Sequence, residues 1–270
     1  MLENDPYPQR IVCLTEETTE TLYLLEQDWR IVGISGFAVR PPRARREKPR
    51  VSGFTSAKMD RIVALKPDLV LGFSDLQADI AADLVRRGIA VHVFNQRSVA
   101  GIFGMVRVLG GIVGCADGAQ RLCARLQNGV DRVQKAAAAF HARPRVYFEE
   151  WDDPMISGIQ WVSELIQIAG GEDCFADLAG ESLASNRIIA DPSEVARRAP
   201  DIVIGSWCGK RFRPDVLASR TGWQQIPAVA NGELHEIKSP LILQPGPAAL
   251  TDGLNALHGI IQRWVRSTPA

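Results

Sequence analysis

The sequence lacks the cysteine patterns that stabilise small secreted proteins or hold a metal ion. Its five cysteines are odd in number, and none stands in a Cys-x-x-Cys or Cys/His ligand spacing. We therefore expect neither a disulfide framework nor a metal site. Isolated cysteines in apolar segments usually behave as small buried hydrophobic residues, which suits a reducing compartment.

An excess of charge of either sign is also absent. Lys plus Arg and Asp plus Glu both count 31, so the net charge is zero. No overall field attracts nucleic acid or an anionic membrane, and we expect no nucleic-acid partner. One basic run is interrupted by Pro41, Pro42 and Pro49, which favours an extended, solvated surface loop over a binding patch. The run comprises Arg40, Arg43, Arg45, Arg46, Lys48 and Arg50.

Long apolar runs are missing as well. A helix needs about 18 to 20 consecutive apolar residues to span a bilayer, and the sequence holds no such run. Residues 1–10 are polar and contain proline, without the basic and apolar regions of a secretory signal. We expect a soluble chain without membrane insertion, cytoplasmic as written and periplasmic if a leader has been removed.

The common enzyme motifs do not occur either. The chain has no Gly-x-Ser-x-Gly elbow, no phosphate loop of the Walker type, and no Gly-x-Gly-x-x-Gly after its first expected strand. We therefore expect no catalytic residues and no covalently bound cofactor.

What the sequence does hold is an alternation of short apolar runs and helical patterns. Runs rich in Val and Ile indicate strands buried on both faces, and the spacing between them predicts helices. The expected strands are residues 10–14, 30–34, 68–73 and 90–94, and the expected helices are residues 18–26, 59–65 and 76–87. Such an alternation is typical of a parallel sheet between helical layers.

From residue 99 the pattern becomes helical and then returns to strands. Residues 99–113 and 117–141 have helical spacing, and the second helix is roughly 37 Å long at 1.5 Å per residue. Further strands are expected at residues 145–149, 201–206 and 233–237. We predict an α/β fold of two three-layer lobes with parallel sheets, joined by a single long α-helix. The predicted parts are an N-terminal lobe with its trailing helix (residues 1–113), the bridging helix (114–142) and a C-terminal lobe (143–270).

The second half of the chain repeats the plan of the first. MDRIVALKPDLVLGFSD (residues 59–75) aligns with PSEVARRAPDIVIGSWC (residues 192–208), each a short helix, a Pro-Asp turn and a buried strand. Two lobes of similar plan are therefore expected. Any two α/β units look alike at this level, so chance similarity is the alternative.

In open parallel sheets the ligand lies beyond the carboxyl ends of the strands, which makes the residues after each strand the candidate site. Two facing lobes would line a cleft with aromatic rings and a few charges, an arrangement that suits a flat, bulky, partly polar ligand. The aromatic residues are Phe37, Phe54, Phe73, Trp151, Trp207 and Phe212, and the charged residues are Glu149, Asp152, Lys210 and Lys238.

Two segments leave alternatives open. The cluster EEWDD (residues 149–153) could bind a hard cation or supply acid–base catalysis, or it could make polar ligand contacts or cap the following helix. Its Trp151 is either a lid on the core or a platform for the ligand. Cys208 follows a strand and precedes Lys210 and Arg211, so it is either an activated thiol or a packed one.

These segments resemble the cobalamin-binding proteins of ABC transport systems, within the superfamily of siderophore and vitamin B12 receptors. The resemblance covers nearly the whole chain. It rests on RIVCLTEETTE (10–20), VGIS (32–35), MDRIVALKPDLVLG (59–72), the long helix, SGIQWVSELIQIAGGEDCF (157–175) and PSEVARRAPDIVIG (192–205). It implies two α/β lobes, one rigid helix between them, and a corrinoid held in the cleft.

The resemblance also implies roles for particular positions. Phe37 and Phe54 would face the corrin ring, and Asp60 and Glu194 would each pair with arginines of a membrane permease. Phenylalanine stands at cleft positions where tyrosine and tryptophan are usual, which leaves the identity of the ligand open. Together with the strand-end rule, the predicted ligand-binding residues are Phe37, Arg40, Phe54, Phe73, Ser74, Glu149, Trp151, Trp207, Cys208 and Lys238.

The function that follows is non-enzymatic binding of a corrinoid, such as cobalamin, by a monomeric component of an ABC importer. A ferric siderophore or haem is an alternative ligand, although it would need Arg or Tyr ligands that the cleft segments do not obviously offer. A cytoplasmic corrinoid chaperone or sensor, or an enzyme with the same fold, is an alternative role.

Overall fold

The computed structural model describes residues 6–269 and divides the chain into two compact units. Unit 1 comprises Met1–Gln96 and Ala100–Arg125, and unit 2 comprises Arg97–Val99 and Leu126–Ala270. Residues 1–5, on which part of the prediction about a leader depends, lie outside the described residues. Among the described residues, no helix is both long and apolar enough to cross a membrane.

Unit 1 is built on a five-stranded parallel sheet with the order β3-β2-β1-β4-β5. The strands are β1 (Ile11–Cys13), β2 (Ile31–Ser35), β3 (Arg50–Ser52), β4 (Leu69–Phe73) and β5 (Val91–Phe94). The strand order reverses at β1, which lies between β2 and β4. The carboxyl end of β1 is therefore the topological switch point, where open α/β sheets bind ligands.

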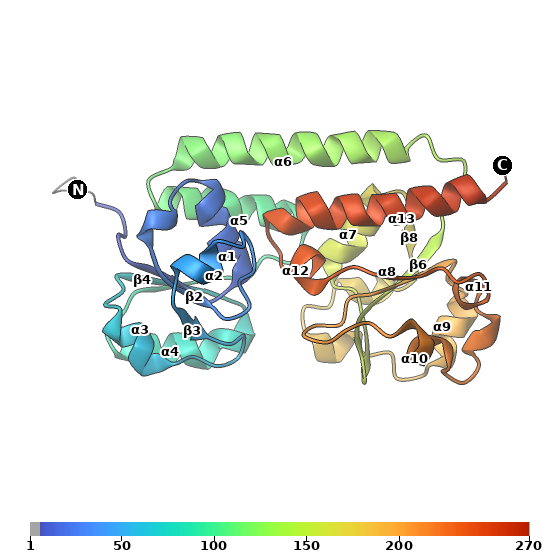
Figure 1. Ribbon diagram of the computed structural model, residues 1–270, viewed down its shortest axis with the longest axis horizontal. Coiled ribbons are helices and arrows are strands. Elements are labelled where there is room, and N and C mark those ends of the chain that lie inside the picture. The colour runs from blue at the N-terminus through green and yellow to red at the C-terminus, as the bar shows by residue number, and fades with distance from the viewer. Residues whose placement is uncertain (1–5, 270) are drawn as a thin grey trace. The chain divides into compact units, whose positions relative to one another are not determined.

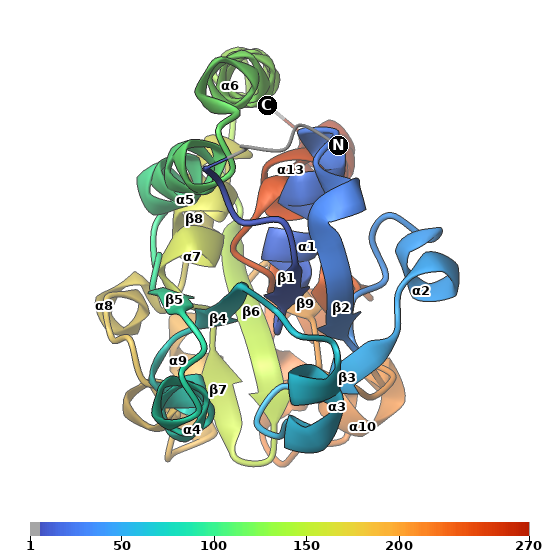
Figure 2. The ribbon, with the colours of Figure 1, turned by 90° about the vertical axis from the view of Figure 1, so that its left-hand side faces the viewer.

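Helices cover both faces of this sheet, which gives unit 1 its three layers (Figures 1 and 2). The helices are α1 (Glu16–Leu24), α2 (Ala44–Glu47), α3 (Met59–Ala64), α4 (Ala78–Arg86) and α5 (Val99–Ile112), with 3-10 turns η1 (Asp28–Arg30) and η2 (Asp75–Gln77). On one face, Ile62 of α3 and Leu84 of α4 pack in one apolar cluster with Val12 and Val70 of the sheet. Helices α1 and α5 cover the other face (Figure 2).

The basic run is not the extended loop that its prolines predict. Residues 44–47 form the helical turn α2, and Arg50–Ser52 pairs with β2 as the edge strand β3. The turn is anchored to α1, because the Tyr23 hydroxyl donates to Glu47 over 2.8 Å and the Arg43 guanidinium lies 4.6 Å from the Tyr23 ring centre. These tertiary contacts override the weak local preference for a loop.

Unit 2 is built on a second five-stranded sheet with the order β10-β9-β6-β7, in which β8 also pairs with β6. The strands are β6 (Arg145–Asp152), β7 (Met155–Ser157), β8 (Glu172–Asp173), β9 (Ile202–Gly205) and β10 (Leu234–Glu236). All pairs are parallel except β6 and β7. Only Asp153 and Pro154 separate those two strands, and so short a connection permits only an antiparallel hairpin. The α/β class is confirmed, with this one antiparallel strand added.

The helices of unit 2 also lie on both faces of its sheet (Figure 1). They are α7 (Gln160–Ile168), α8 (Ala176–Ala179), α9 (Ser193–Arg198), α10 (Pro214–Ala218), α11 (Pro227–Ala230), α12 (Ser239–Ile242) and α13 (Leu254–Ser267), with 3-10 turns η3 (Ala184–Arg187) and η4 (Trp223–Gln225). Val195 of α9 and Leu217 of α10 pack with Tyr147 and Val203 on one face. Helices α7 and α13 cover the other face (Figure 1).

The segment before α13 is regular although it contains Pro245 and Pro247. It contains the π-helical turn η5 (Ala249–Gly253), which runs directly into α13. Gly253 permits this path, because a Cβ there would lie 2.4 Å from the carbonyl oxygen of Leu241. The Thr251 hydroxyl donates to the Pro247 carbonyl over 2.9 Å, which satisfies a carbonyl that the wide turn leaves open.

The predicted long helix is present as α6 (Ala116–Ala137), a single helix of 22 residues. Its apolar stripe is buried at helical spacing, at Ala119, Leu122, Leu126, Val130 and Val133. The helix ends four residues earlier than predicted. The backbone N–H groups of residues 139 and 140 donate to the carbonyls three residues before them, which is the tighter pattern of a helix end. The boundary between the units falls inside α6, and the three-part division of the chain stays a prediction.

The internal repeat has a structural counterpart at the two Pro-Asp turns. Lys66 and Ala199, each directly before the proline, adopt left-handed backbone angles with φ of 48° and 44°. Asp68 then accepts from the Arg10 backbone N–H over 2.9 Å, and Asp201 accepts from the Arg145 backbone N–H over 2.8 Å. Each aspartate thus fixes the start of the first strand of its own unit. The left-handed conformation of the residue before each proline costs roughly 1–2 kcal/mol. The hydrogen bond of the following aspartate to the first strand offsets this cost.

Candidate functional site

Unit 1 gathers its predicted site residues in the loops after β2, β3 and β4. Phe37 follows β2 with 49% of its surface exposed, and its ring passes 3.9 Å from the position that a Cβ on Gly53 would occupy. Phe54 is half-buried in the loop after β3. The loops after β2 and β3 therefore bring two phenylalanines to the same edge of the sheet.

The two predicted residues at the end of β4 are less accessible. Phe73 and Ser74 are only 5% and 3% exposed. Ser74 has a φ of 60°, and its hydroxyl oxygen accepts from the Leu76 backbone N–H over 3.3 Å at the start of η2. Both side chains are buried and stabilise the loop, and they offer little accessible surface to a ligand.

Gln77 organises these loops, and the sequence analysis did not single it out. Its side chain is 1% exposed and donates to the carbonyls of Phe54, over 2.8 Å, and of Leu14, over 3.3 Å. Its amide oxygen accepts from the Phe73 backbone N–H over 3.0 Å. One amide thus ties together the ends of β1 and β4 and the loop after β3. The Gly72 position allows this, because a Cβ there would lie 3.1 Å from the Gln77 oxygen.

Three glutamates of α1 lie at the switch point after β1. Burial is the main cause that raises the pKa of Glu16 to about 8 and that of Glu17 to about 7, and neighbouring glutamates add to both shifts. One carboxylate oxygen of each, Oε2 of Glu16 and Oε1 of Glu17, is buried without a hydrogen-bond partner among the described residues. Glu20 instead accepts from Arg40, a predicted site residue, over 2.7 Å. Near neutral pH this corner of the site carries carboxyl groups that are largely protonated or poised to titrate.

The predicted site residue Glu149 lies at the centre of a buried network in unit 2. Its side chain is 0% exposed, and its oxygens accept from the Tyr147 hydroxyl over 2.8 Å and from Trp207 Nε1 over 2.9 Å. Arg220 donates to both oxygens, with Nη2 3.0 Å from Oε1. Burial together with the Glu149 charge holds the pKa of Tyr147 well above its usual range. Glu149 reaches no solvent, so its effect on a ligand would pass through the ring of Trp207.

Next to this network the ammonium group of Lys210 lies close to two indole rings. Lys210 Nζ is 4.1 Å from the ring centre of Trp151 and 5.3 Å from that of Trp207, and it also pairs with Asp152. Trp151 Nε1 donates to the Asp153 carbonyl over 2.8 Å, which fixes the half-buried ring at the end of β6. Trp207 is only 4% exposed. Lys210 thus places a cation over the indole ring of Trp151 and near that of Trp207.

A pocket of about 300 Å³ lies beside this surface, at the carboxyl ends of β9 and β10. It brings together Trp207 and Lys238, two predicted site residues, with Lys210. Lys238 Nζ pairs with Glu236 over 2.8 Å. Cys208, adjacent to Trp207, is exposed at the same strand end. The strand-end rule therefore located a concave surface in unit 2.

The acidic cluster at residues 149–153 does not converge on one point. Glu149 faces Arg220 in the core, Glu150 accepts from Arg187 over 2.7 Å, and Asp152 pairs with Lys210. Glu149 and Glu150 are neighbours in β6 and point to opposite faces of the sheet. Each of the three carboxylates meets a different cation. Within residues 6–269, no group of three or more His, Cys, Asp or Glu side chains is arranged to hold a metal ion.

The two residues expected to meet a permease occupy equivalent places in the repeat. Asp60 lies in the first turn of α3 and Glu194 in the first turn of α9. Asp60 is exposed. Glu194 accepts from Arg198 over 2.7 Å and also pairs with Arg197, so part of its charge is already balanced.

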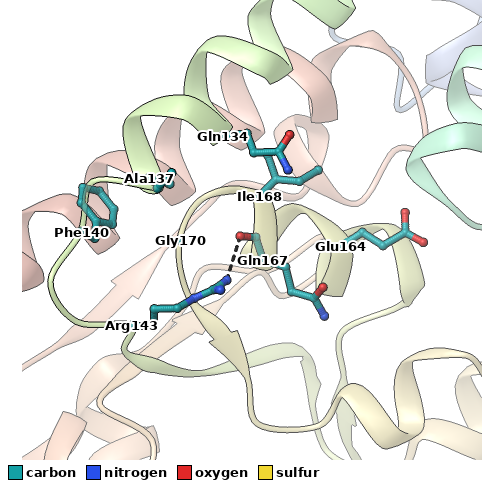
Figure 3. Close-up of a pocket in the computed structure, with 9 residues that line it drawn as sticks. Gln134, Ala137, Phe140, Arg143, Glu164, Gln167, Ile168 and Gly170 are labelled. Atoms are coloured by element: carbon teal, nitrogen blue, oxygen red, sulfur yellow. Dashed lines mark hydrogen bonds between the residues drawn. The ribbon is translucent and has the colours of Figure 1, made fainter.

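A larger pocket of about 560 Å³ lies away from the strand ends, between the end of α6 and helix α7 (Figure 3). Its two charged side chains are already engaged. Arg143 donates to the Gln167 carbonyl over 3.2 Å, and Glu164 accepts from the Val99 backbone N–H over 2.6 Å. This pocket therefore offers little to a ligand, and the strand-end surfaces are the better candidates.

Comparison with known proteins agrees with the fold. The chain is 25% identical to a cobalamin-binding protein of Halobacterium salinarum, over 90% of this chain and 67% of that one. It is 25% identical to a vitamin B12-binding protein of Pectobacterium carotovorum, over 82% of this chain and 78% of that one. The structure of the periplasmic heme-binding protein RhuT from Roseiflexus superposes with a TM-score of 0.78 at 23% identity, covering 94% of this chain and 99% of that one. The sequence model of the family described as periplasmic binding protein matches residues 11–241, and the chain belongs to that family.

Proposed function

We propose that this protein binds a corrinoid without catalysing a reaction, as the solute-binding component of an ABC importer. The observation that carries the proposal is the surface of Trp151, Lys210 and Trp207 beside the pocket at the ends of β9 and β10. The relatives named as cobalamin- and vitamin B12-binding proteins support it, because the similarity spans most of this chain.

The unit 2 surface suits one side of a large flat ring with polar substituents. An indole offers a broad apolar face at low entropic cost, and a few fixed polar groups set the orientation of a ligand. Lys210 and Lys238 supply donors to amide or carboxylate groups on the rim of such a ring. The network around Glu149 holds Trp207 in place, which lowers the cost of ordering the surface when a ligand binds.

Unit 1 supplies the second surface in this proposal. Phe37 is half-exposed at the end of β2, and Phe54 follows β3 in a loop that Gln77 fixes. Arg40, held by Glu20, adds a cation beside these rings. We propose that Phe37 and Phe54 are the residues of unit 1 that contact the ring of the ligand.

Asp60 and Glu194 are the proposed contacts with permease subunits, and the protein is proposed to act as a monomer. This role requires export of the chain, since importers of this kind take their solute outside the cytoplasmic membrane. A chain that remains in the cytoplasm would instead serve as a corrinoid chaperone or sensor. Fractionation of cells that express the complete natural gene separates the two locations.

A titration with cobalamin and cobinamide, followed by visible spectroscopy and desalting, tests the proposal. We expect one corrinoid to be retained per chain. Trp151→Ala should weaken binding by about fivefold or more, because a well-placed aromatic contact contributes roughly 1 kcal/mol beyond its buried area. The matched control is Trp29→Ala, which removes an indole that is 56% exposed and lies outside the strand-end loops.

Failure of both corrinoids to change spectrum or to stay bound on desalting would remove the corrinoid proposal. Retention of hemin in their place would favour the haem alternative. The enzymatic alternative is tested with Cys208→Ser. If the wild-type protein chemically alters cobalamin and this variant does not, the exposed thiol of Cys208 reacts. We expect Cys208→Ser to bind corrinoid as the wild type does and neither protein to alter it.

A further inference from the structure

A groove of about 780 Å³ lies in unit 1 at the edge strand β3 and reaches Gly36, directly after β2. The turn α2, strand β3 and helix α3 contribute its walls. Its lining residues are Gly36, Arg45, Lys48, Pro49, Arg50, Val51, Ser52, Lys58, Arg61, Ala64 and Leu65. The volume falls within the range of about 300–1,000 Å³ that small-molecule sites usually have.

The charges of this groove are all of one sign. Arg45, Lys48, Arg50, Lys58 and Arg61 line it, and no carboxylate does. Among the described residues, none of these five cations forms an ion pair. Their side chains make one hydrogen bond there, from Arg45 to the Gly36 carbonyl over 3.5 Å. The groove therefore carries a local excess of positive charge in a chain whose net charge is zero.

The nearby acidic groups do not neutralise the groove. Glu47 on α2 accepts from Tyr23 and lies 3.7 Å from Arg43, outside the lining. Glu16 interacts with Arg45 from the core side, but its pKa of about 8 leaves it largely protonated at neutral pH. The field in the groove is therefore positive and open to an anion.

A buried hydroxyl lies among these cations. Ser52 is 7% exposed, and its Oγ is buried without a hydrogen-bond partner among the described residues. An unsatisfied buried hydroxyl costs roughly 1–3 kcal/mol, so its presence calls for a partner. An anion in the groove would supply acceptor oxygens for the guanidinium and ammonium groups, and it would reach this buried hydroxyl only after a shift of the groove wall.

Protection of a sheet edge is the competing explanation, because lysine and arginine on an edge strand discourage pairing with other chains. Edge protection accounts for Arg50 on β3 itself. It does not account for Lys58 and Arg61, which come from the neighbouring helical segment, or for the buried Ser52 hydroxyl. Convergence of cations from three elements on one concave surface favours a bound anion.

We propose that this groove binds a small phosphorylated anion with more than one phosphoryl group. Arginine forks and lysine ammonium groups form charge-assisted hydrogen bonds with phosphoryl oxygens. The groove is too large for a single phosphate to reach all five cations, whereas a diphosphate or triphosphate spans more of them. The proposal is independent of the corrinoid proposal and concerns different residues.

Isothermal titration with pyrophosphate, ATP and AMP at low and high ionic strength tests it. We expect saturable binding of pyrophosphate and ATP, weaker binding of AMP, and a loss of affinity as salt screens the charges. Equal affinities for pyrophosphate and ATP would indicate recognition of the phosphoryl groups alone, and tighter binding of ATP would indicate a nucleotide. Either result supports the site.

The variant Arg50→Gln/Lys58→Gln should weaken pyrophosphate binding about 100-fold, since each charge-assisted hydrogen bond contributes roughly tenfold. Its matched control is Arg86→Gln/Arg107→Gln, which removes two exposed cations of the same unit outside the groove. Circular dichroism checks that both variants fold. The proposal is overturned if pyrophosphate and ATP do not bind, if the control loses as much affinity, or if only long nucleic acid binds. Self-association of the groove variant without anion binding would establish edge protection instead.

Discussion

Removing Arg220 should destabilise unit 2 strongly, because it leaves a fully buried carboxylate without its cation. Glu149 is 0% exposed and Arg220 is 16% exposed, and the guanidinium contacts both carboxylate oxygens. Breaking such a pair from one side costs about 3–5 kcal/mol. For Arg220→Met we therefore expect a loss of this size in the free energy of unfolding of unit 2. In a domain of this size, that loss lowers the melting temperature by roughly 6–20 °C.

Urea unfolding followed by tryptophan fluorescence measures this change in the relevant unit. Five of the six tryptophans belong to unit 2, and the sixth is Trp29 of unit 1. The control is Arg213→Met, which breaks an ion pair with Asp215 whose two side chains are 59% and 66% exposed. Exposed pairs of this kind contribute about 0–1 kcal/mol, so the control should unfold almost as the wild type does.

The double variant Glu149→Leu/Arg220→Met separates a paired charge from a mere packing defect. The double variant leaves no buried charge without a partner. The Tyr147 hydroxyl and Trp207 Nε1 lose their acceptor, but an unpaired neutral donor costs less than an unpaired buried charge, so the double variant should be more stable than Arg220→Met alone. The reasoning is refuted if Arg220→Met loses no more than the control, or if the double variant is less stable than the single one.

Two further predictions concern unit 1. Folding raises the pKa values of Glu16 and Glu17 from 4.5 to about 8 and about 7, so the folded state binds more protons, and stability should fall as the pH rises from about 4.5 to about 8. Glu16→Gln/Glu17→Gln should flatten that dependence in urea unfolding at a series of pH values; an unchanged slope would contradict the assignment. Gln77→Ala should cost about 3 kcal/mol or more, because it strips partners from the buried Leu14 carbonyl, the buried Phe73 N–H and the partly buried Phe54 carbonyl. Calorimetry checks this against Gln127→Ala on the exposed face of α6, and equal melting temperatures would refute it.

Most of the fold could be predicted from the sequence because its signals are local. Buried parallel strands appear as apolar runs, and all seven predicted strands are present within a few residues of their expected bounds. The strands that were missed, β3, β7 and β8, are only two or three residues long and have no apolar run of their own. Strand β3 even lies within the basic run, where pairing with β2 rather than local preference decides the structure.

The sequence predicts where along the chain candidate site residues lie, but not how their side chains are packed. The strand-end rule led to Phe37, Trp207 and Lys238, whose loops surround the ends of the strands. It could not show that Glu149 is buried, since only the fold brings Arg220, 71 residues away in sequence, against its carboxylate. Gln77 was missed for the same reason, because two of its three partners lie 23 and 63 residues away. A glutamine one turn beyond a glycine-containing strand was the only local signal.

The two units share a scaffold but handle their strand-end carboxylates in opposite ways. The repeated Pro-Asp turns place Asp68 and Asp201 in the same role, so the sequence repeat accounts for the backbone of both units. The loops after the strands are not repeated. Unit 1 buries Glu17 without a cation, which raises its pKa, whereas unit 2 buries Glu149 against Arg220 and keeps a charged pair. Duplication therefore explains the framework, and the chemistry offered to a ligand arises from the segments in which the two halves differ.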